Sequence, residues 1–135
     1  MTHEDANNTD AEKLADKVVD SASTVHNALG PGLLETAYEA ALCHELSTRG
    51  IHFERKRPMP LRYGEALLDC GYHVDLLVED SIIVELEAVD AIQPIHEAQL
   101  LTHLRLSGKS LGLLINFNAR ILKHGIIRIA QLPPQ

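Results

Sequence analysis

Apolar residues recur at every third or fourth position in the N-terminal part of the chain, which is the spacing of an amphipathic helix. The first series consists of Leu14, Val18, Ala22, Val25 and Leu29. Gly30-Pro31-Gly32 ends this predicted helix, and a second apolar series predicts another helix from about residue 33 to 48, ended by Gly50. Residues 1–10 are polar, and we expect them to form a disordered tail.

Short apolar runs separated by turn residues predict strands in the rest of the chain. The predicted strands cover residues 51–57, 59–63, 67–76, 82–88, 111–117 and 125–130. The run 111–117 is continuously apolar, as expected for a central strand covered on both faces. A further helix is predicted over 95–106, and Pro133 and Pro134 indicate a loose C-terminal tail. This order of elements predicts a single α/β or α+β domain over residues 11–132.

The segment from residue 75 to 87 predicts a hairpin with carboxylates inside two apolar strands. Because strand side chains alternate, Glu85 and Glu87 lie on one face. If residues 79–81 form the turn, Asp75 lies opposite Glu85. Three converging carboxylates are the kind of oxygen ligands that hold a divalent cation. The alternatives are a sheet edge open to solvent for Asp75 and Glu85, and a solvated strand end for Glu87.

Composition limits the partners and the location of this domain. The 135 residues are 45% hydrophobic and 23% charged, as in an ordinary soluble domain, and the longest apolar run is far short of a membrane span. We expect no membrane partner and a cytoplasmic location. The formal charge of −7 disfavours nonspecific phosphate binding by the monomer. Cys43 and Cys70 have no metal-like spacing, so reduced and buried thiols are expected, with a disulfide as the alternative.

Several segments together resemble a known family. Gly32-Leu-Leu-Glu35-Thr-Ala-Tyr38 fits the Gly-x-x-Glu-x-x-Tyr signature of the small GxxExxY proteins, which are placed in the PD-(D/E)XK nuclease-like superfamily. The resemblance continues through the Asp75–Glu85 hairpin, Ala98-Gln99 and the strand 111–117, and it covers about residues 14 to 130. The order and spacing of these segments carry the resemblance.

This resemblance implies a mixed, roughly four-stranded sheet flanked by helices, and a site that binds magnesium or manganese and hydrolyses phosphodiesters of nucleic acid. By position, Glu35 would be a carboxylate of the first core helix, and Asp75 and Glu85 the metal ligands. Gln99 matches the glutamine of a Gln-x-x-x-Tyr motif near the site. The predicted catalytic set is therefore Glu35, Asp75, Glu85, Glu87 and Gln99, with Asp75, Glu85 and Glu87 as the predicted metal ligands.

Two positions depart from the family pattern. Glu87 stands where the lysine of a Glu-x-Lys motif belongs, and His103 stands at the tyrosine position of Gln-x-x-x-Tyr. The lysine would orient or help deprotonate the attacking water and compensate developing negative charge. A glutamate reverses the charge at this point, so the cluster should repel a substrate phosphate and raise the pKa of at least one carboxyl.

Three interpretations follow from these departures. The first is a degenerate nuclease fold kept for binding or assembly. The second is an altered metal site in which Glu87 is an extra ligand and His96, Gln99 and His103 share one helix face. The third keeps nuclease activity with a cation that migrates into the site, and its candidates are Arg55, Lys56, Arg57 and Lys109.

Each candidate also has an ordinary structural role to set against the functional one. Glu35 and Tyr38 suit the start and packing of a helix, Gln99 suits a helix surface, and the two histidines suit a half-buried or exposed position. We predict a nuclease-like protein with catalysis lost or altered. The alternative is a non-enzymatic homo-oligomeric structural or interaction protein, and homo-oligomers are expected in either case.

Overall fold

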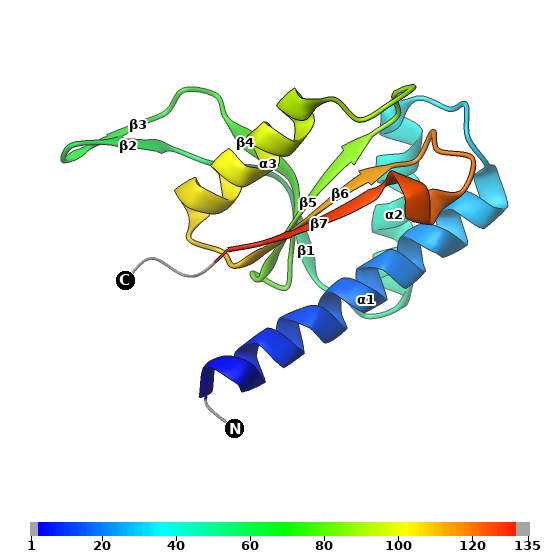
Figure 1. The fold of residues 1–135 in the computed structure, drawn as a ribbon, viewed down its shortest axis with the longest axis horizontal. Helices are drawn as coiled ribbons and strands as arrows, with labels where there is room; N and C mark the ends of the chain where they lie inside the picture. Colours follow the sequence, from blue (N-terminus) through cyan, green and yellow to red (C-terminus); the bar gives the residue numbers. More distant parts are fainter. Residues whose placement is uncertain (1–2, 132–135) are drawn as a thin grey trace.

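The computed structural model describes residues 3–131 as an α/β domain with a five-stranded sheet between helices (Figure 1). The N-terminal helices are α1 (His3–Leu29) and α2 (Glu35–Thr48). The strands that follow are β1 (Phe53–Pro58), β2 (Leu61–Tyr63), β3 (Ala66–Leu68), β4 (His73–Val78) and β5 (Ile82–Glu87). The C-terminal elements are α3 (Pro94–Ser107), β6 (Leu111–Asn116), a 3-10 helix η1 (Leu122–Gly125) and β7 (Ile126–Ala130). The predicted loose tail at Pro133 and Pro134 lies outside the described residues.

The fold class predicted from the sequence is confirmed, with two corrections to the strands. The sheet has five strands in the order β1-β4-β5-β6-β7, where roughly four were expected. The predicted single strand over residues 67–76 is wrong, because Gly71 has a φ of 78° and separates β3 from β4. A positive φ turns an extended chain aside, so the two halves of this run join different sheets. The helix α1 begins at His3, and the disorder of residues 1–10 stays a prediction.

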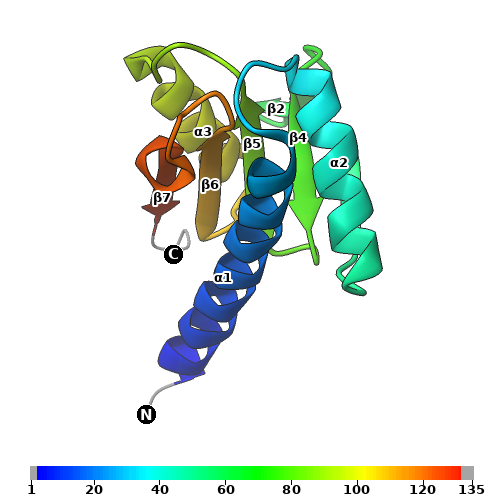
Figure 2. The ribbon, with the colours of Figure 1, turned by 90° about the vertical axis from the view of Figure 1, so that its right-hand side faces the viewer.

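The sheet is mixed, and helices cover both of its faces. β5 and β6 are parallel, while the other neighbouring strands are antiparallel. α1 and α2 pack on one face of the sheet and α3 packs on the other. Figure 2 shows α2 and α3 on opposite sides of the sheet. β6 is buried along its whole length, which confirms that the apolar run is a central strand. Within residues 3–131, no helix is long and apolar enough to span a membrane.

The acidic turn between β4 and β5 consists of Glu79, Asp80 and Ser81, as predicted from the sequence. Glu79 and Asp80 both have positive φ, 51° and 52°, and Ser81 N donates to Val78 O at 2.9 Å. Two consecutive positive φ values define a type I′ turn, whose twist matches that of the flanking strands. The turn sets the register in which Leu76 faces Val84. Continued by one residue, this register brings Asp75 and Glu85 together as predicted.

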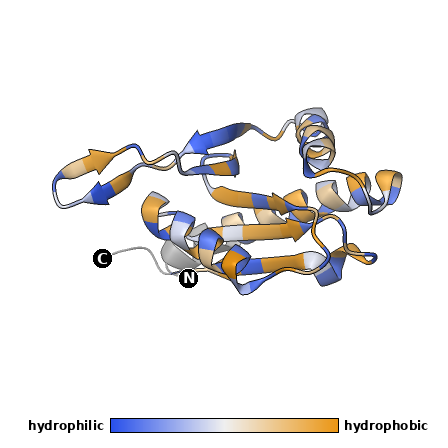
Figure 3. Ribbon diagram, turned by 90° about the horizontal axis from the view of Figure 1, so that it is seen from above, coloured by the Kyte–Doolittle hydropathy of each residue, from blue (hydrophilic) through white to orange (hydrophobic). Residues whose placement is uncertain are grey.

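β2 and β3 form a separate two-stranded hairpin, here called the arm (residues 61–68), which extends from the body of the domain (Figures 1 and 3). Gly64 has a φ of 63° and begins its two-residue turn. Because the strands pair Leu61 with Leu68 and Tyr63 with Ala66, these four side chains share one face of the arm.

Tyr38 fixes the loop between α1 and α2, directly before Glu35. Its hydroxyl donates to Gly30 O at 2.6 Å and accepts from Leu33 N at 3.1 Å, while its ring stacks on Phe117 at 4.8 Å between centroids. The side chain is fully buried. The Gly-x-x-Glu-x-x-Tyr spacing therefore places Tyr38 one helical turn after Glu35, the first residue of α2. We call the two hydrogen bonds by which Tyr38 holds this loop the clamp.

We expect Tyr38→Phe to lower the free energy of unfolding by about 1–3 kcal/mol, because it keeps the stacked ring but leaves Gly30 O and Leu33 N without this partner. Chemical denaturation measures the change. Tyr63→Phe is the matched control, because Tyr63 is exposed and should lose almost nothing. Equal stability of Tyr38→Phe and the unsubstituted protein would show that the loop does not depend on this clamp.

Candidate carboxylate centre

Asp75 lies where β4 and β5 separate. Backbone pairing of these strands ends at Leu76 and Val84. Beyond that point, side-chain carboxylates accept the backbone hydrogen bonds. Asp75 Oδ2 accepts a hydrogen bond from Leu86 N at 2.8 Å, and Asp75 N donates to Glu85 Oε2 at 3.4 Å. The two predicted carboxylates are therefore adjacent, and both are engaged with backbone N–H groups.

Glu85 forms a buried pair with His103 of α3. Its Oε1 shares a short hydrogen bond with His103 Nδ1, and the two residues are only 9% and 8% exposed. Burial raises the pKa of Glu85, and the hydrogen bond from His103 opposes that rise. Tyr72 covers the imidazole edge-on, with 6.5 Å between ring centroids. The tyrosine position of the family motif is thus filled by a partner for the central carboxylate.

Glu87 and Glu35 complete an acidic cluster around Asp75. Partial burial raises the pKa of Glu35 to about 7, and the carboxylates of Glu87, Asp75 and Glu39 add to the rise. Partial burial also raises the pKa of Glu87, and His96 opposes this increase. Glu35 starts α2, whereas Glu87 ends β5, so the cluster lies where the start of α2 is near the end of β5. The mutual effects on pKa place these groups within electrostatic reach of one another.

The basic residues of β1 are paired elsewhere. Arg55 donates to Glu39 Oε2 at 2.6 Å, and Lys56 Nζ lies 3.9 Å from Glu39 Oε1. Arg57 pairs with Glu54 at 2.7 Å. Lys56 has a φ of 51° at the point where β1 passes Asp75, and its charge lowers the pKa of Glu35 in part. It is the β1 cation with an electrostatic effect on the cluster.

Lys109, the remaining candidate cation, lies 3.3 Å from Asp80 at the acidic turn. Within residues 3–131, none of the four candidate cations forms an ion pair with Asp75, Glu85 or Glu87. The ion pairs of these four residues therefore do not support the interpretation in which one of them supplies the positive charge of the missing lysine.

Gln99 and His96 do not join the carboxylates through a described hydrogen bond. Gln99 is exposed on α3. His96 Nδ1 accepts from Gln93 N at 2.8 Å and so caps the start of α3. Since His103 is committed to Glu85, the three residues of this helix face have different environments and partners. The catalytic role of Gln99 stays a prediction.

The donor set does not fit a nuclease metal centre as it is arranged. Glu85 uses Oε1 for His103 and Oε2 for Asp75 N, and Asp75 uses Oδ2 for Leu86 N. Among the residues the structure describes, no group of three or more His, Cys, Asp or Glu side chains lies in position to hold a metal ion. Metal ligation by Asp75, Glu85 and Glu87 stays a prediction, and a cation bound there would have to share the oxygens of Asp75 and Glu85 with these hydrogen-bond donors.

The raised pKa of Glu35 predicts a pH-dependent loss of stability. Its folded value of about 7 exceeds the ordinary 4.5, so the folded state holds this proton more tightly than the unfolded chain. This contribution to stability is fully present below pH 4.5, falls as the pH rises to about 7, and is absent above it. We expect Glu35→Gln to gain stability relative to the unsubstituted protein as the pH rises through this window.

Thermal melting at several pH values measures this difference. Glu65→Gln is the control, because Glu65 is an exposed glutamate at the tip of the arm. A melting-temperature difference between Glu35→Gln and the unsubstituted protein that does not change with pH would contradict the raised pKa of Glu35.

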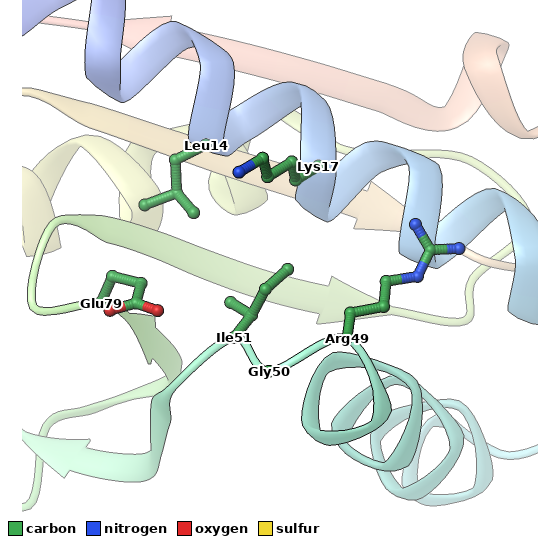
Figure 4. Close-up of a pocket in the computed structure, with 6 residues that line it drawn as sticks. All are labelled: Leu14, Lys17, Arg49, Gly50, Ile51 and Glu79. Atoms are coloured by element: carbon green, nitrogen blue, oxygen red, sulfur yellow. The ribbon is translucent and has the colours of Figure 1, made fainter.

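The described surface also has a hollow of about 530 Å³ between α1 and the segment that joins α2 to β1 (Figure 4). It is lined by Leu14, Lys17, Arg49, Gly50, Ile51 and Glu79. None of the predicted catalytic residues lines it, so it is separate from the carboxylate centre.

The mixed sheet, its flanking helices and the acidic strand pair are those of a nuclease-like α/β domain. The family model for the PD-(D/E)XK nuclease superfamily matches residues 12–129, and the chain belongs to this superfamily. Comparisons with curated proteins and with solved structures give no match. Enzymes of this superfamily generally depend on a divalent metal. In this chain, by contrast, Asp75 and Glu85 accept hydrogen bonds from protein groups.

Proposed function

We propose that this protein is a nuclease-like domain of the GxxExxY type in which ordinary metal-dependent phosphodiester hydrolysis is lost. The Gly32–Tyr38 signature and its clamp on the loop before Glu35 support the subfamily. Nucleic acid is the substrate class to test, because the superfamily suggests it. A cytoplasmic location is part of the proposal.

The observation that carries this proposal is the pairing of Glu85 with His103 beside a glutamate at the lysine position. Phosphodiester hydrolysis needs free carboxylate oxygens for a cation and a positive charge that compensates the developing negative charge. In this chain the hydrogen bonds with His103 and Asp75 N engage both oxygens of Glu85. Glu87 adds negative charge, and its effect extends to the pKa of Glu35.

The arrangement can instead hold protons and hydrogen bonds. The pKa values of Glu35, Glu85 and Glu87 are all raised, chiefly by burial, so each of these carboxyls keeps its proton to a higher pH than an exposed glutamate does. A protonated carboxyl donates a hydrogen bond, and a cluster of this kind can stabilise the end of the sheet without a cation. We therefore assign the centre a structural role.

Cleavage assays test the proposal. The protein is incubated with plasmid and with single-stranded DNA and RNA in magnesium or manganese, beside Asp75→Ala and Glu87→Lys. We expect no cleavage by the unsubstituted protein above the level of Asp75→Ala. Cleavage that appears only in Glu87→Lys would identify the missing lysine as the cause of inactivity, whereas cleavage by the unsubstituted protein that Asp75→Ala abolishes would refute the proposal.

A second candidate function is a non-enzymatic homo-oligomeric structural or interaction protein. The arm supports it, because Tyr63 and Leu67 of this hairpin are exposed large apolar side chains. A domain with the nuclease fold can self-associate whether or not it hydrolyses phosphodiesters, so this candidate function can coexist with the loss of hydrolysis.

A further inference from the structure

The net charge of −7 is distributed unevenly along the sequence. All 19 acidic residues precede residue 98, and the part that follows contains five basic residues: Arg105, Lys109, Arg120, Lys123 and Arg128. Lys109 and Arg128 form ion pairs with carboxylates of the acidic turn and of α1. Among the side chains of residues 10–131, no carboxylate forms an ion pair with Arg120, Lys123 or His124. The segment 120–124 therefore forms a local basic patch on an acidic chain.

A second hollow, of about 470 Å³, lies at this segment and is lined by Ala119, Arg120, Ile121 and His124. We call it the basic hollow. It lies beside η1, the orange-red coil between β6 and β7 in Figure 1. Its volume is within the range of small-molecule sites, roughly 300–1,000 Å³. It shares no lining residue with the hollow in Figure 4, and none of the predicted catalytic residues lines it.

The backbone around the basic hollow is fixed by contacts with the rest of the domain. His26 Nε2, at the end of α1, donates to Ala119 O at 2.7 Å. Gly125 packs so closely that a Cβ atom there would lie 2.6 Å from the backbone oxygen of Asn116. Leu122 is buried in the core between the sheet and the N-terminal helices. The loop is therefore anchored before, within and after η1, as is usual for binding residues that a rigid scaffold positions.

The side chains on this fixed backbone are exposed, and their donors suit an anion. Arg120 and His124 are exposed, and Ile121 is 56% exposed between them. A guanidinium donates through a planar fork, and an imidazole donates at least one N–H group in every protonation state that occurs near neutral pH. No acidic side chain lines the basic hollow, so these donors face no competing carboxylate there.

The number of donors favours a phosphate over a carboxylate. A phosphate monoester has three terminal oxygens and a charge of about −1.5 to −2 at pH 7. It can therefore accept hydrogen bonds from Arg120 and His124 at the same time. A carboxylate has two oxygens, and one arginine fork engages both of them. Lys123 adjoins His124 and adds positive charge to the same segment.

We propose that the basic hollow binds the phosphate group of a phosphate monoester, with Arg120 and His124 as the hydrogen-bond donors. Ile121 offers apolar surface to the organic part of the ester. The monoester belongs either to a small phosphorylated molecule or to the phosphorylated end of a nucleic-acid chain, since both present the same group. This site is separate from the carboxylate centre, so the inference goes beyond the loss of hydrolysis and does not depend on it.

Titration of the full chain, followed by the amide chemical shifts in NMR, tests the proposal. The probes are inorganic phosphate, adenosine monophosphate, and short single-stranded DNA with and without a 5′-phosphate, each beside sodium chloride at the same ionic strength. A reductant is included, because both cysteines are free thiols; Cys43 is buried as expected, whereas Cys70 is exposed, which corrects its expected burial.

The variants remove one exposed side chain each. Arg120→Gln and His124→Gln change the basic hollow. Arg105→Gln is the matched control, because Arg105 is an exposed basic residue of the same acid-free part of the chain and lies on α3. α3 packs on the face of the sheet opposite to that of Leu122. Circular dichroism checks that all three variants keep the folded domain.

We expect saturable shifts at the amides of residues 118–125 with inorganic phosphate and with adenosine monophosphate. Arg120→Gln should raise the dissociation constant more than about tenfold, because it removes a charge-assisted fork, and His124→Gln about fivefold. Arg105→Gln should leave it unchanged. If the phosphate monoester binds in this way, DNA that binds more tightly with its 5′-phosphate would identify a nucleic-acid end as a source, and equal binding of the two DNAs would identify a small molecule.

Three results would overturn the proposal. The first is an absence of saturable shifts with both inorganic phosphate and adenosine monophosphate. The second is a set of shifts that sodium chloride alone reproduces. The third is an equal loss of binding in Arg105→Gln and Arg120→Gln. Each of these results is independent of the cleavage assays, because the variants leave the carboxylate centre unchanged.

Discussion

Replacement of His103 by leucine is expected to lower the free energy of unfolding by about 3 kcal/mol at pH 8, because it leaves the buried Glu85 carboxylate without its side-chain partner. The loss should shrink in acid. His103 lowers the pKa of Glu85, so its removal raises that pKa further above the ordinary 4.5. Protonation of Glu85 at low pH then removes the buried charge, and the penalty disappears below the unfolded pKa.

Denaturation at pH 8 and pH 5 measures this effect, and a double variant provides its control. Replacing Glu85 and His103 together by leucine removes the charge and its partner at once, which is often neutral for stability. The double variant should therefore recover most of the loss at pH 8. If His103→Leu alone matched the unsubstituted protein at pH 8, the buried pair would have no part in holding the centre.

Asn116→Ala is the second change with a large expected effect, again about 3 kcal/mol. Asn116 is buried, its Nδ2 donates to Val89 O at 2.9 Å, and its Oδ1 accepts from Val89 N at 3.1 Å and Asn118 N at 3.2 Å. Each of these three hydrogen bonds contributes on the order of 1 kcal/mol. Val89 lies two residues after Glu87, so Asn116 fixes the segment that leaves the acidic cluster.

Denaturation and amide hydrogen exchange together measure the role of Asn116. We expect faster exchange at Val89 and its neighbours in Asn116→Ala. Asn118→Ala is the matched control, because Asn118 is less buried and its shortest side-chain bond is to Gly32 N at 3.0 Å. A loss of stability in Asn118→Ala as large as that in Asn116→Ala would show that no special support comes from Asn116.

The sequence predicts the parts of the fold that depend on local patterns. Helical periodicity located the core of α1 and most of α2, and the apolar run at 111–117 predicted the buried central strand β6. The acidic turn also set the register that joins Asp75 to Glu85. These features depend on spacing along the chain, which the sequence displays directly.

The features that the sequence did not predict depend on tertiary structure. The break at Gly71 and the separate arm depend on a backbone angle that alternation of apolar residues does not specify. The pairing of His103 with Glu85 joins residues 18 positions apart on different elements. The sequence did offer a signal for it, because His103 lies beside Leu104 and three residues after Leu100, both of which are buried on the inner side of α3. A histidine on that side must find a polar partner in the sheet.

The central proposal is that Asp75 and Glu85, which are engaged with each other, with backbone N–H groups and with His103, do not hold a divalent cation. Thermal melting with and without magnesium or manganese, beside Asp75→Ala, tests it most directly, since a ligand that binds the folded state raises the melting temperature. The account predicts the same small response to cations in both proteins. A cation-dependent rise in the unsubstituted protein that Asp75→Ala abolishes would contradict it.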